Sequence, residues 1–202
     1  MQIRNTRQTY GLIAILLHWM IALGFLIAYV SVYYMRWYTK ADTSENLTAL
    51  QIHISIGVSV GAFVVLSIIW KAINATPEDV PGTCLEHIAA HIVRLGLYAI
   101  MIIMPITGYL GMKRPPMLLF SLQIPNFEET AIFETIVAGW MGLTFNEFER
   151  VVDLIHHLGG RWIFWWPIAL HAGAAVYHHV IRKDIALKRM LSPSAKTWPH
   201  SL

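Results

Sequence analysis

Four long stretches of this chain contain almost no charged side chain, and they limit the possible folds more than any other feature. A run of about 20 apolar residues can cross the ~30 Å hydrocarbon core of a bilayer as a helix. Only 13% of the residues are charged, whereas a soluble domain has about a quarter. The sequence therefore predicts an all-α membrane protein, a four-helix transmembrane bundle in one domain over residues 1–202. Its expected spans are about 11–35, 47–70, 87–112 and 152–181.

Composition also excludes several classes of protein. The single cysteine, Cys84, allows no internal disulfide, and the Cys-x-x-Cys-His motif that attaches c-type haem is absent. The net charge of +3 is small. We interpret the lysines and arginines as residues that flank membrane spans, not as a nucleic-acid-binding surface. Membrane lipid is therefore an expected partner, and nucleic acid is not.

The distribution of positive charge predicts the orientation of the spans, because lysines and arginines concentrate in cytoplasmic loops. Arg4 and Arg7 precede the first span, Lys71 follows the second, and a compact basic cluster follows the fourth. We therefore expect four crossings with both termini in the cytoplasm. The cluster consists of Arg182, Lys183, Lys188, Arg189 and Lys196. The basic residues expected on the opposite side of the membrane are Arg36, Lys40, Lys113, Arg114, Arg150 and Arg161.

The longest connection, residues 113–151, has a mixed composition. Within it, residues 131–148 alternate apolar side chains with Glu134, Trp140 and Glu147. This pattern fits an amphipathic segment lying at the membrane interface. A loop that simply caps the bundle fits equally well, and the sequence leaves both interpretations open.

Four histidines inside the apolar segments are the candidate functional residues: His18, His53, His157 and His171. An imidazole in hydrocarbon is costly unless it is hydrogen-bonded or coordinates a metal. His157 and His171 are 14 residues apart, which is roughly 1,400° of α-helical turn and about 21 Å, so they share a face at two depths. Antiparallel spans then predict two pairs at matched depths, His18 with His171 and His53 with His157.

A b-type haem takes one axial imidazole on each side of its iron, and bis-histidine ligation favours electron transfer over oxygen binding. The two pairs therefore predict two non-covalent haem b groups, with the four histidines as iron ligands. Gly57 and Gly61 follow His53 at helical spacing and clear one helix face for a flat macrocycle. Small residues also serve helix packing in membranes, so the glycines alone fit either interpretation.

Other histidines compete for a role. His156 is adjacent to His157 and lies ~60° from the face of His171, against ~40° for His157, so geometry alone separates them narrowly. His87 and His91 are one turn apart, and they are either a metal-binding pair or interfacial residues. His178 lies two turns beyond His171, where it either serves a quinone or reaches the headgroups.

Several segments resemble the bacterial cytochrome b561 family of four-helix di-haem cytochromes. The most specific is HAGAAVYHHVIRKDIALKRM, from His171 to Met190, and the resemblance covers nearly the whole chain except residues 113–151. It implies His18, His53, His157 and His171 as axial ligands, and the family's 14-residue spacing selects His157 over His156. The other matching pieces are residues 7–19, Gln51 to Gly57, Met104-Pro105-Ile106-Thr107-Gly108 and His157-Leu158-Gly159.

The resemblance implies an electron carrier of the bacterial inner membrane, working between a periplasmic-side donor and the quinone pool. One relative of this kind is a superoxide oxidase, so superoxide is a candidate donor, ubiquinone a candidate acceptor, and oxidoreductase activity an expectation beside pure electron carriage. Arg150 and Arg161 lie where they would steer an anion or pair with haem propionates, or simply anchor the interface.

Two other functions remain open from the sequence. The chain is a candidate membrane anchor, the cytochrome b subunit of a larger redox enzyme, with residues 113–151 docking its redox partner protein. The second open function is that of a haem-free transporter or signalling anchor whose histidines relay protons. It leaves the pairing of the histidines at two depths unexplained.

Overall fold

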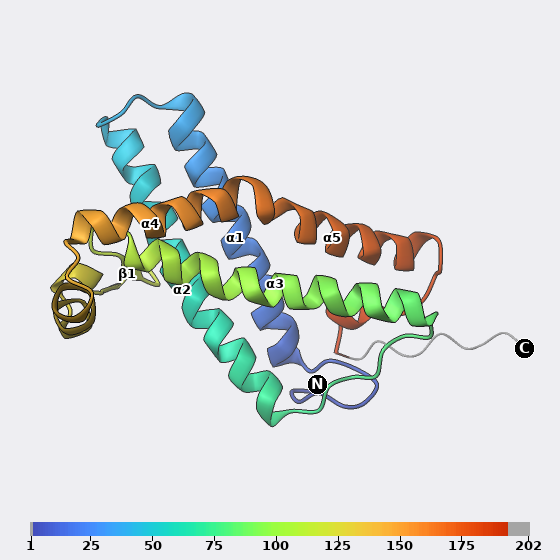
Figure 1. Cartoon of the computed structure of the whole chain (residues 1–202). Coiled ribbons are helices and arrows are strands. Elements are labelled where there is room, and N and C mark those ends of the chain that lie inside the picture. The colour runs from blue at the N-terminus through green and yellow to red at the C-terminus, as the bar shows by residue number, and fades with distance from the viewer. Residues whose placement is uncertain (1, 194–202) are drawn as a thin grey trace, which may run out of the picture. The chain divides into compact units, whose positions relative to one another are not determined.

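The computed structural model describes residues 2–193 and is predominantly helical (Figure 1). This confirms the predicted all-α class for the described residues, apart from one small hairpin. The long helices are α1 (Leu12–Tyr38), α2 (Ser44–Ile73) and α3 (Cys84–Leu110), followed by α4 (Phe145–Leu158) and α5 (Trp165–Val180). Strands β1 (Met117–Leu118) and β2 (Leu122–Gln123) pair antiparallel. The short helices are η1 (Phe127–Glu129), η2 (Phe133–Trp140), η3 (Gly159–Ile163) and η4 (Lys188–Met190).

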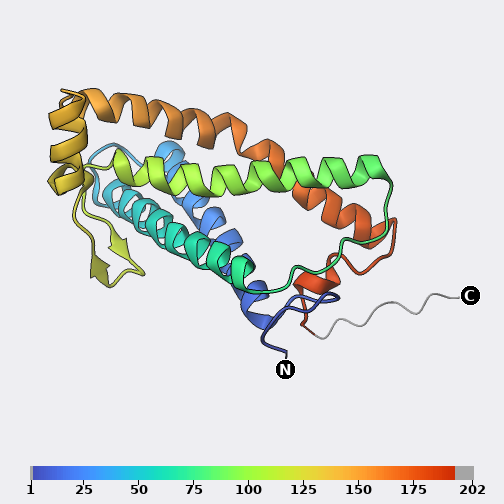
Figure 2. The same cartoon turned by 60° about the horizontal axis from the view of Figure 1, so that its bottom comes forward.

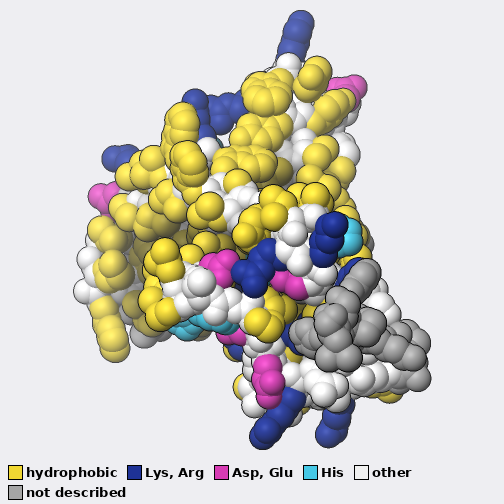
Figure 3. Space-filling view, turned by 90° about the vertical axis from the view of Figure 1, so that its right-hand side faces the viewer, with side chains coloured by type: hydrophobic (Ala, Val, Ile, Leu, Met, Phe, Trp, Pro, Cys, Tyr) yellow, Lys and Arg dark blue, Asp and Glu magenta, His cyan; other side chains and the backbone are white. Residues whose placement is uncertain are grey.

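Three of the four predicted spans are single long helices. Within the described residues, α1, α2 and α3 are long and apolar enough to cross a membrane. Only 22% of the most apolar window of α1, 22% of that of α2 and 6% of that of α3 is buried inside the protein. Their apolar side chains therefore face outward, as expected of helices surrounded by lipid. Hydrophobic side chains cover much of the surface in Figure 3.

The fourth predicted span, residues 152–181, is not one uninterrupted α-helix. It consists of the end of α4, the π-helix η3 and then α5, so neither α-helix has the length of a complete span by itself. A π turn closes i→i+5 hydrogen bonds and therefore holds one residue more than an α turn. Two consecutive glycines, Gly159 and Gly160, begin it, and the hydroxyl of Tyr29 donates a 2.7 Å hydrogen bond to the Gly160 carbonyl.

The described residues divide into two compact units, each assembled from segments far apart in the sequence. The first contains residues 2–19, 65–99 and 162–193, and the second contains residues 20–64 and 100–161. The single domain predicted over residues 1–202, the four-helix bundle and the cytoplasmic position of both termini stay predictions, and Lys196 lies outside the described residues.

The core of the second unit lies where α1 and α2 approach closely. Ile21, Val60 and Val64 form a buried cluster. A Cβ on Gly24 would overlap the Val60 side chain, so the absence of a side chain there lets the two helices pack.

The connection over residues 113–151 folds into its own small structures. After the β-hairpin, an aromatic cluster of Phe127, Phe133 and Phe145 packs around Val137. Helix α4 then begins at a capping box, in which Thr144 and Glu147 each bond the other's backbone N–H. Within the segment predicted to be amphipathic, Val137 is 3% exposed and Trp140 is 82% exposed. The segment is therefore two-faced, while its position relative to a membrane interface stays a prediction.

Candidate functional site

His18 and His171 lie side by side in the first unit. His18 comes from the first half of α1 and His171 from the middle of α5, and their ring centres are 6.0 Å apart with planes tilted by 59°. Trp19 packs edge-on against His18 at 5.5 Å and donates its indole N–H to the Met190 carbonyl at 2.7 Å. This expected pair is therefore brought together by helices from opposite ends of the chain.

The second unit contains a second histidine pair, formed by His53 of α2 and His156 of α4. Their ring centres are 6.1 Å apart and their planes are nearly perpendicular, at 86°. His157, the residue expected to pair with His53, is exposed on α4. The structure thus brings His156 to His53 and places the adjacent imidazole elsewhere on the helix surface.

A backbone carbonyl fixes the ring of His53. Its Nδ1 lies 2.8 Å from the carbonyl oxygen of Ala28 on α1. A carbonyl oxygen only accepts hydrogen bonds, so Nδ1 carries the proton and donates it. The Nε2 lone pair of His53 is then available as a ligand, which is the arrangement that metal-binding histidines commonly show.

A threonine hydroxyl fixes His156 in the same way. The Nδ1 of His156 lies 3.1 Å from Thr107 Oγ1 on α3, and that hydroxyl is 2.7 Å from the Ile103 carbonyl oxygen. Because the hydroxyl proton goes to the carbonyl, Oγ1 is left to accept the Nδ1 proton. Gly108 makes room for the ring, since a Cβ there would lie 3.1 Å from His156 Cε1.

The π-helix bears on the narrow preference for His157 over His156 that helical spacing gave and that the family resemblance decided. The expectation that His157 shares a face with His171 assumes an uninterrupted α-helix. Residues 159–163 form a π-helix instead, and its extra residue is absorbed without advancing the α-helical phase. His156 is one residue farther from His171 than His157 is. Because the π turn holds one extra residue, this longer spacing takes the place of the spacing that a regular α-helix would require.

The geometry of both pairs fits a haem iron. A metal–imidazole nitrogen bond is about 2 Å long and the nitrogen lies roughly 1.2 Å from the ring centre, so two rings sharing an iron have centres roughly 6.4 Å apart. The observed separations are 6.0 and 6.1 Å. One turn beyond His53, a Cβ built on Gly57 would meet no atom within 4 Å, so space is open beside that ligand. Gly61 differs, because its Cβ would press on Pro105 and its role is helix packing.

The remaining histidines have other partners. His178 Nδ1 lies 2.5 Å from Asp184 Oδ2. His87 lies 3.9 Å from Asp79, but that carboxylate is held mainly by the Arg94 guanidinium at 2.8 Å. The Arg94 hydrogen bond lowers the pKa of Asp79 below its usual value. His87 and His91 line a cavity of about 370 Å³, and among the described residues no group of three potential ligands converges on a metal site.

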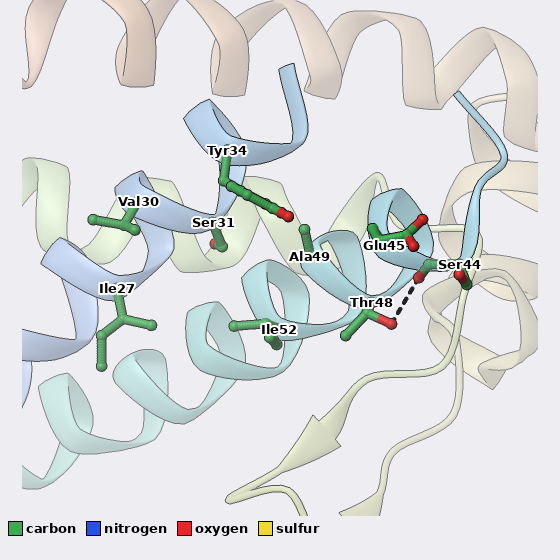
Figure 4. A pocket seen from close by; sticks show the side chains of 9 residues that line it. All are labelled: Ile27, Val30, Ser31, Tyr34, Ser44, Glu45, Thr48, Ala49 and Ile52. Carbon is green, nitrogen blue, oxygen red and sulfur yellow. Dashed lines mark hydrogen bonds between the residues drawn. The ribbon is translucent and has the colours of Figure 1, made fainter. Parts of the chain in front are cut away.

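A larger cavity of about 470 Å³ lies between α1 and α2 in the second unit (Figure 4). Most of its lining is apolar or weakly polar, and no histidine contributes to it, so it is separate from the paired imidazoles. Thr48 on its wall bonds back to the Ser44 carbonyl at 2.7 Å. The lining residues are Ile27, Val30, Ser31, Tyr34, Ser44, Glu45, Thr48, Ala49 and Ile52.

Sequence reasoning missed the groups that hold the rings of His53 and His156. Nothing local in the sequence connects the Ala28 carbonyl with His53 across 25 residues, or Thr107 with His156 across 49 residues. The one available signal was the segment Met104 to Gly108, whose threonine and glycine now have a physical role beside His156.

Comparison with known proteins identifies the family of the chain. A family model described as prokaryotic cytochrome b561 matches residues 9–193. Cytochrome b561 homolog 2 of Escherichia coli (strain K12) is 28% identical over 212 residues, covering 98% of this chain and 99% of that protein. Cytochrome b561 homolog 1 of the same organism is 26% identical over 190 residues, covering 88% and 93%. The match to the family model over most of the chain, joined to long apolar helices and paired imidazoles, shows that the chain belongs to the prokaryotic cytochrome b561 family of membrane-bound, haem-binding electron-transfer proteins.

Proposed function

We propose that the chain is a di-haem b-type cytochrome of the bacterial inner membrane, with both termini cytoplasmic. His18 and His171 would hold one haem, and His53 with a histidine of α4 would hold the other. The observation that supports this proposal most is the pair of imidazole contacts, at 6.0 and 6.1 Å between ring centres, in two separate units of the fold.

For the second haem, contact geometry favours His156, whereas the sequence expectation is His157. His156 is the ring beside His53, and its Nδ1 proton is already accepted by Thr107. His157 is exposed. We therefore propose His156 as the partner of His53 and keep His157 as the alternative that the experiment below distinguishes.

Bound haem would supply reversible one-electron chemistry at iron. The protein's part would be to hold each iron between two imidazoles, those of His18 and His171 and those of His53 and His156, which favours electron transfer over oxygen binding. The anchored Nδ1 protons of His53 and His156 hold the rings in one tautomer and orientation, so that little rearrangement accompanies a change of iron charge.

The proposed electron path joins a donor on the periplasmic side to the quinone pool. Superoxide is the proposed donor, because Arg150 in α4 and Arg161 in η3 supply positive charge and cationic surfaces speed the approach of small anions. His178 is the proposed quinone-site residue. Its Nδ1 donates to the Asp184 carboxylate at 2.5 Å, and the Arg182 Nε lies 4.0 Å from the same carboxylate. In the protonated imidazole, Nε2–H would donate to a quinone oxygen.

Haem content of single variants tests the ligands. We expect His18→Ala and His171→Ala each to remove one haem, and His53→Ala and His156→Ala each to remove the other, because one imidazole cannot complete bis-histidine ligation. His157→Ala is the matched control and should retain both haems. Pyridine haemochrome stoichiometry on purified protein, with reduced-minus-oxidised spectra, gives the measurement.

Two outcomes would contradict these assignments. Loss of one haem in His157→Ala with both retained in His156→Ala would restore His157 as the ligand. Loss of both haems from every variant would indicate unfolding, not ligation. Separately, a superoxide flux should reduce the haems of the intact protein and then the quinone; reduction no faster than the uncatalysed background would exclude superoxide as donor while leaving the cytochrome assignment standing.

A further inference from the structure

The segment between α3 and η1 has an unusual composition for a loop. Residues 115–127 contain no charged side chain, whereas Lys113 and Arg114 precede them and Glu128 and Glu129 follow. The middle of the segment forms the two-stranded hairpin, in which Met117 pairs with Gln123 and Leu118 with Leu122. An uncharged hairpin with charges only at its base is the pattern expected of a segment that dips into hydrocarbon.

Buried serines of α2 bind the backbone of the hairpin, and the hairpin is drawn as the pair of arrows in Figure 2. The backbone N–H of Met117 donates to Ser55 Oγ at 3.2 Å, and that of Leu119 donates to Ser59 Oγ at 2.8 Å. Ser55 is 0% exposed and Ser59 is 3% exposed. Gln51 adds a further bond from its amide to the Pro115 carbonyl at 3.3 Å.

These contacts lie deep along a membrane-spanning helix. Ser59 is 15 residues after Ser44, the first residue of α2, or roughly 22 Å along its axis. The 30 residues of α2 extend about 45 Å, which exceeds the ~30 Å hydrocarbon core by about 15 Å. Even if all of that excess projected beyond the bilayer on the hairpin's side, Ser59 would lie several ångströms inside the hydrocarbon.

Several backbone N–H groups of the hairpin have partners within the protein, which favours placing this backbone in lipid. Besides the serine contacts, the N–H groups of Phe120, Ser121 and Ile124 donate to backbone carbonyls at 2.9–3.2 Å. Pro115, Pro116 and Pro125 have no N–H to satisfy.

The tip of the hairpin points apolar side chains outward. Leu119, Phe120 and Leu122 are 56%, 51% and 61% exposed. Leu119 and Phe120 also have positive φ angles of 50° and 57°, a conformation that tight hairpins normally give to Asn or Gly. Exposing these large apolar side chains to water is costly, whereas in a bilayer they would contact acyl chains.

We propose that residues 115–125 are a re-entrant hairpin whose tip, Leu119, Phe120 and Leu122, contacts lipid acyl chains inside the bilayer. The partner of this surface is the hydrocarbon core, and the buried serines of α2 hold the hairpin at that depth. Within the described residues, this is the only strand pair.

Site-directed spin labelling in phosphatidylcholine vesicles tests the proposal on the full-length protein. In a Cys84→Ser background, one cysteine is placed at Phe120→Cys, at Val65→Cys on the exposed apolar face of α2, or at Lys40→Cys in the polar loop between α1 and α2. We expect the label at 120 to resemble that at 65, with high exposure to dissolved oxygen and low exposure to a water-soluble nickel complex. Exposure to the nickel complex equal to that at 40 would overturn the proposal.

A second copy of the chain is the other possible cover for the tip. In that case the label at 120 would be shielded from both reagents, and its spectrum would show label–label broadening that disappears on dilution with unlabelled protein. This result would also overturn lipid contact. As a second measurement, Ser59→Ala in the Phe120→Cys protein should shift the label toward water, because the Leu119 N–H loses its acceptor, whereas Ser59→Thr keeps a hydroxyl and should leave the label's depth unchanged.

Discussion

The second nitrogen of each histidine decides what its ring can do. In the second unit both rings have Nδ1 tied down, His53 by the Ala28 carbonyl and His156 by the Thr107 hydroxyl. This leaves both Nε2 atoms unprotonated, which is the form that binds a metal. His53 lies on α2, and the two hydrogen-bond partners lie on α1 and α3. Three helices besides α4 therefore contribute to one histidine pair.

Thr107 offers a test of this arrangement that leaves the imidazoles intact. Thr107→Val keeps the shape of the side chain but removes the acceptor of the His156 Nδ1 proton, so the affinity for one haem should fall by about 10- to 100-fold. Haem transfer to apomyoglobin measures this loss, and the midpoint potential of the same haem should change while the other stays constant.

Thr48→Val is the matched control, because Thr48 makes the same bond to the carbonyl four residues earlier but contacts no histidine. It should retain both haems with unchanged transfer rates. Equal behaviour of Thr107→Val and the native protein would mean that the Thr107 hydroxyl does not hold an iron ligand.

At the scale of elements, the π-helix between α4 and α5 determines which residues of α4 are in helical phase with α5. Sequence patterns placed α1, α2 and α3 to within a few residues: expected spans of 11–35, 47–70 and 87–112 correspond to Leu12–Tyr38, Ser44–Ile73 and Cys84–Leu110. Long apolar runs are a local property, so they are readable without tertiary contacts. A single extra residue in a π turn leaves hydropathy unchanged, so the same pattern could not reveal it.

Deleting one residue of the π-helix separates the two candidate ligands. Removal of Ile163 should convert the turn to regular α-helix and shorten the spacing from His156 to His171 by one residue. If His156 is the ligand, both haems should remain, since the regular α-helix then repeats the face that the π turn provided. Haem stoichiometry and circular dichroism of the purified variant check this.

Deletion of Ala41, in the loop between α1 and α2, is the control for shortening the chain and should also keep both haems. Loss of one haem on deletion of Ile163 alone would favour His157, because its spacing to His171 would then be one residue too short for a shared face.

At the scale of the whole molecule, the connection between α2 and α3 joins the segments of the first unit. It contacts the N-terminal segment, α3 and the residues after α5, although these are far apart in sequence. The Asp79 carboxylate accepts two hydrogen bonds from Arg94, at 2.8 and 3.4 Å. The other contacts are Asn5 to Ala75, Glu78 to Arg7, Arg182 to Pro81 and Arg189 to Glu78, all involving backbone carbonyls.

This network predicts a dependence of stability on acid pH. The hydrogen bond from Arg94 lowers the pKa of Asp79 in the folded protein. A lowered folded-state pKa stabilises the protein above the unfolded pKa, about 3.9 for Asp, and that contribution is lost as the pH falls through the lower folded value. We expect the Tm of detergent-solubilised protein to fall below about pH 4, and to fall less in Asp79→Asn. Thermal unfolding across this range measures it, and identical pH profiles would show that the pair contributes nothing.

The sequence alone determined the membrane class, three of the spans and the set of histidines from which the pairs are drawn. These follow from apolar run length and from the cost of imidazole in hydrocarbon, which depend on nearby residues only. The tertiary structure decided that His156 and not His157 faces His53, and that the segment after α3 folds back against Ser55 and Ser59. Both depend on hydrogen bonds between residues far apart in the chain and on one extra residue in a turn, and such contacts form only after the helices pack.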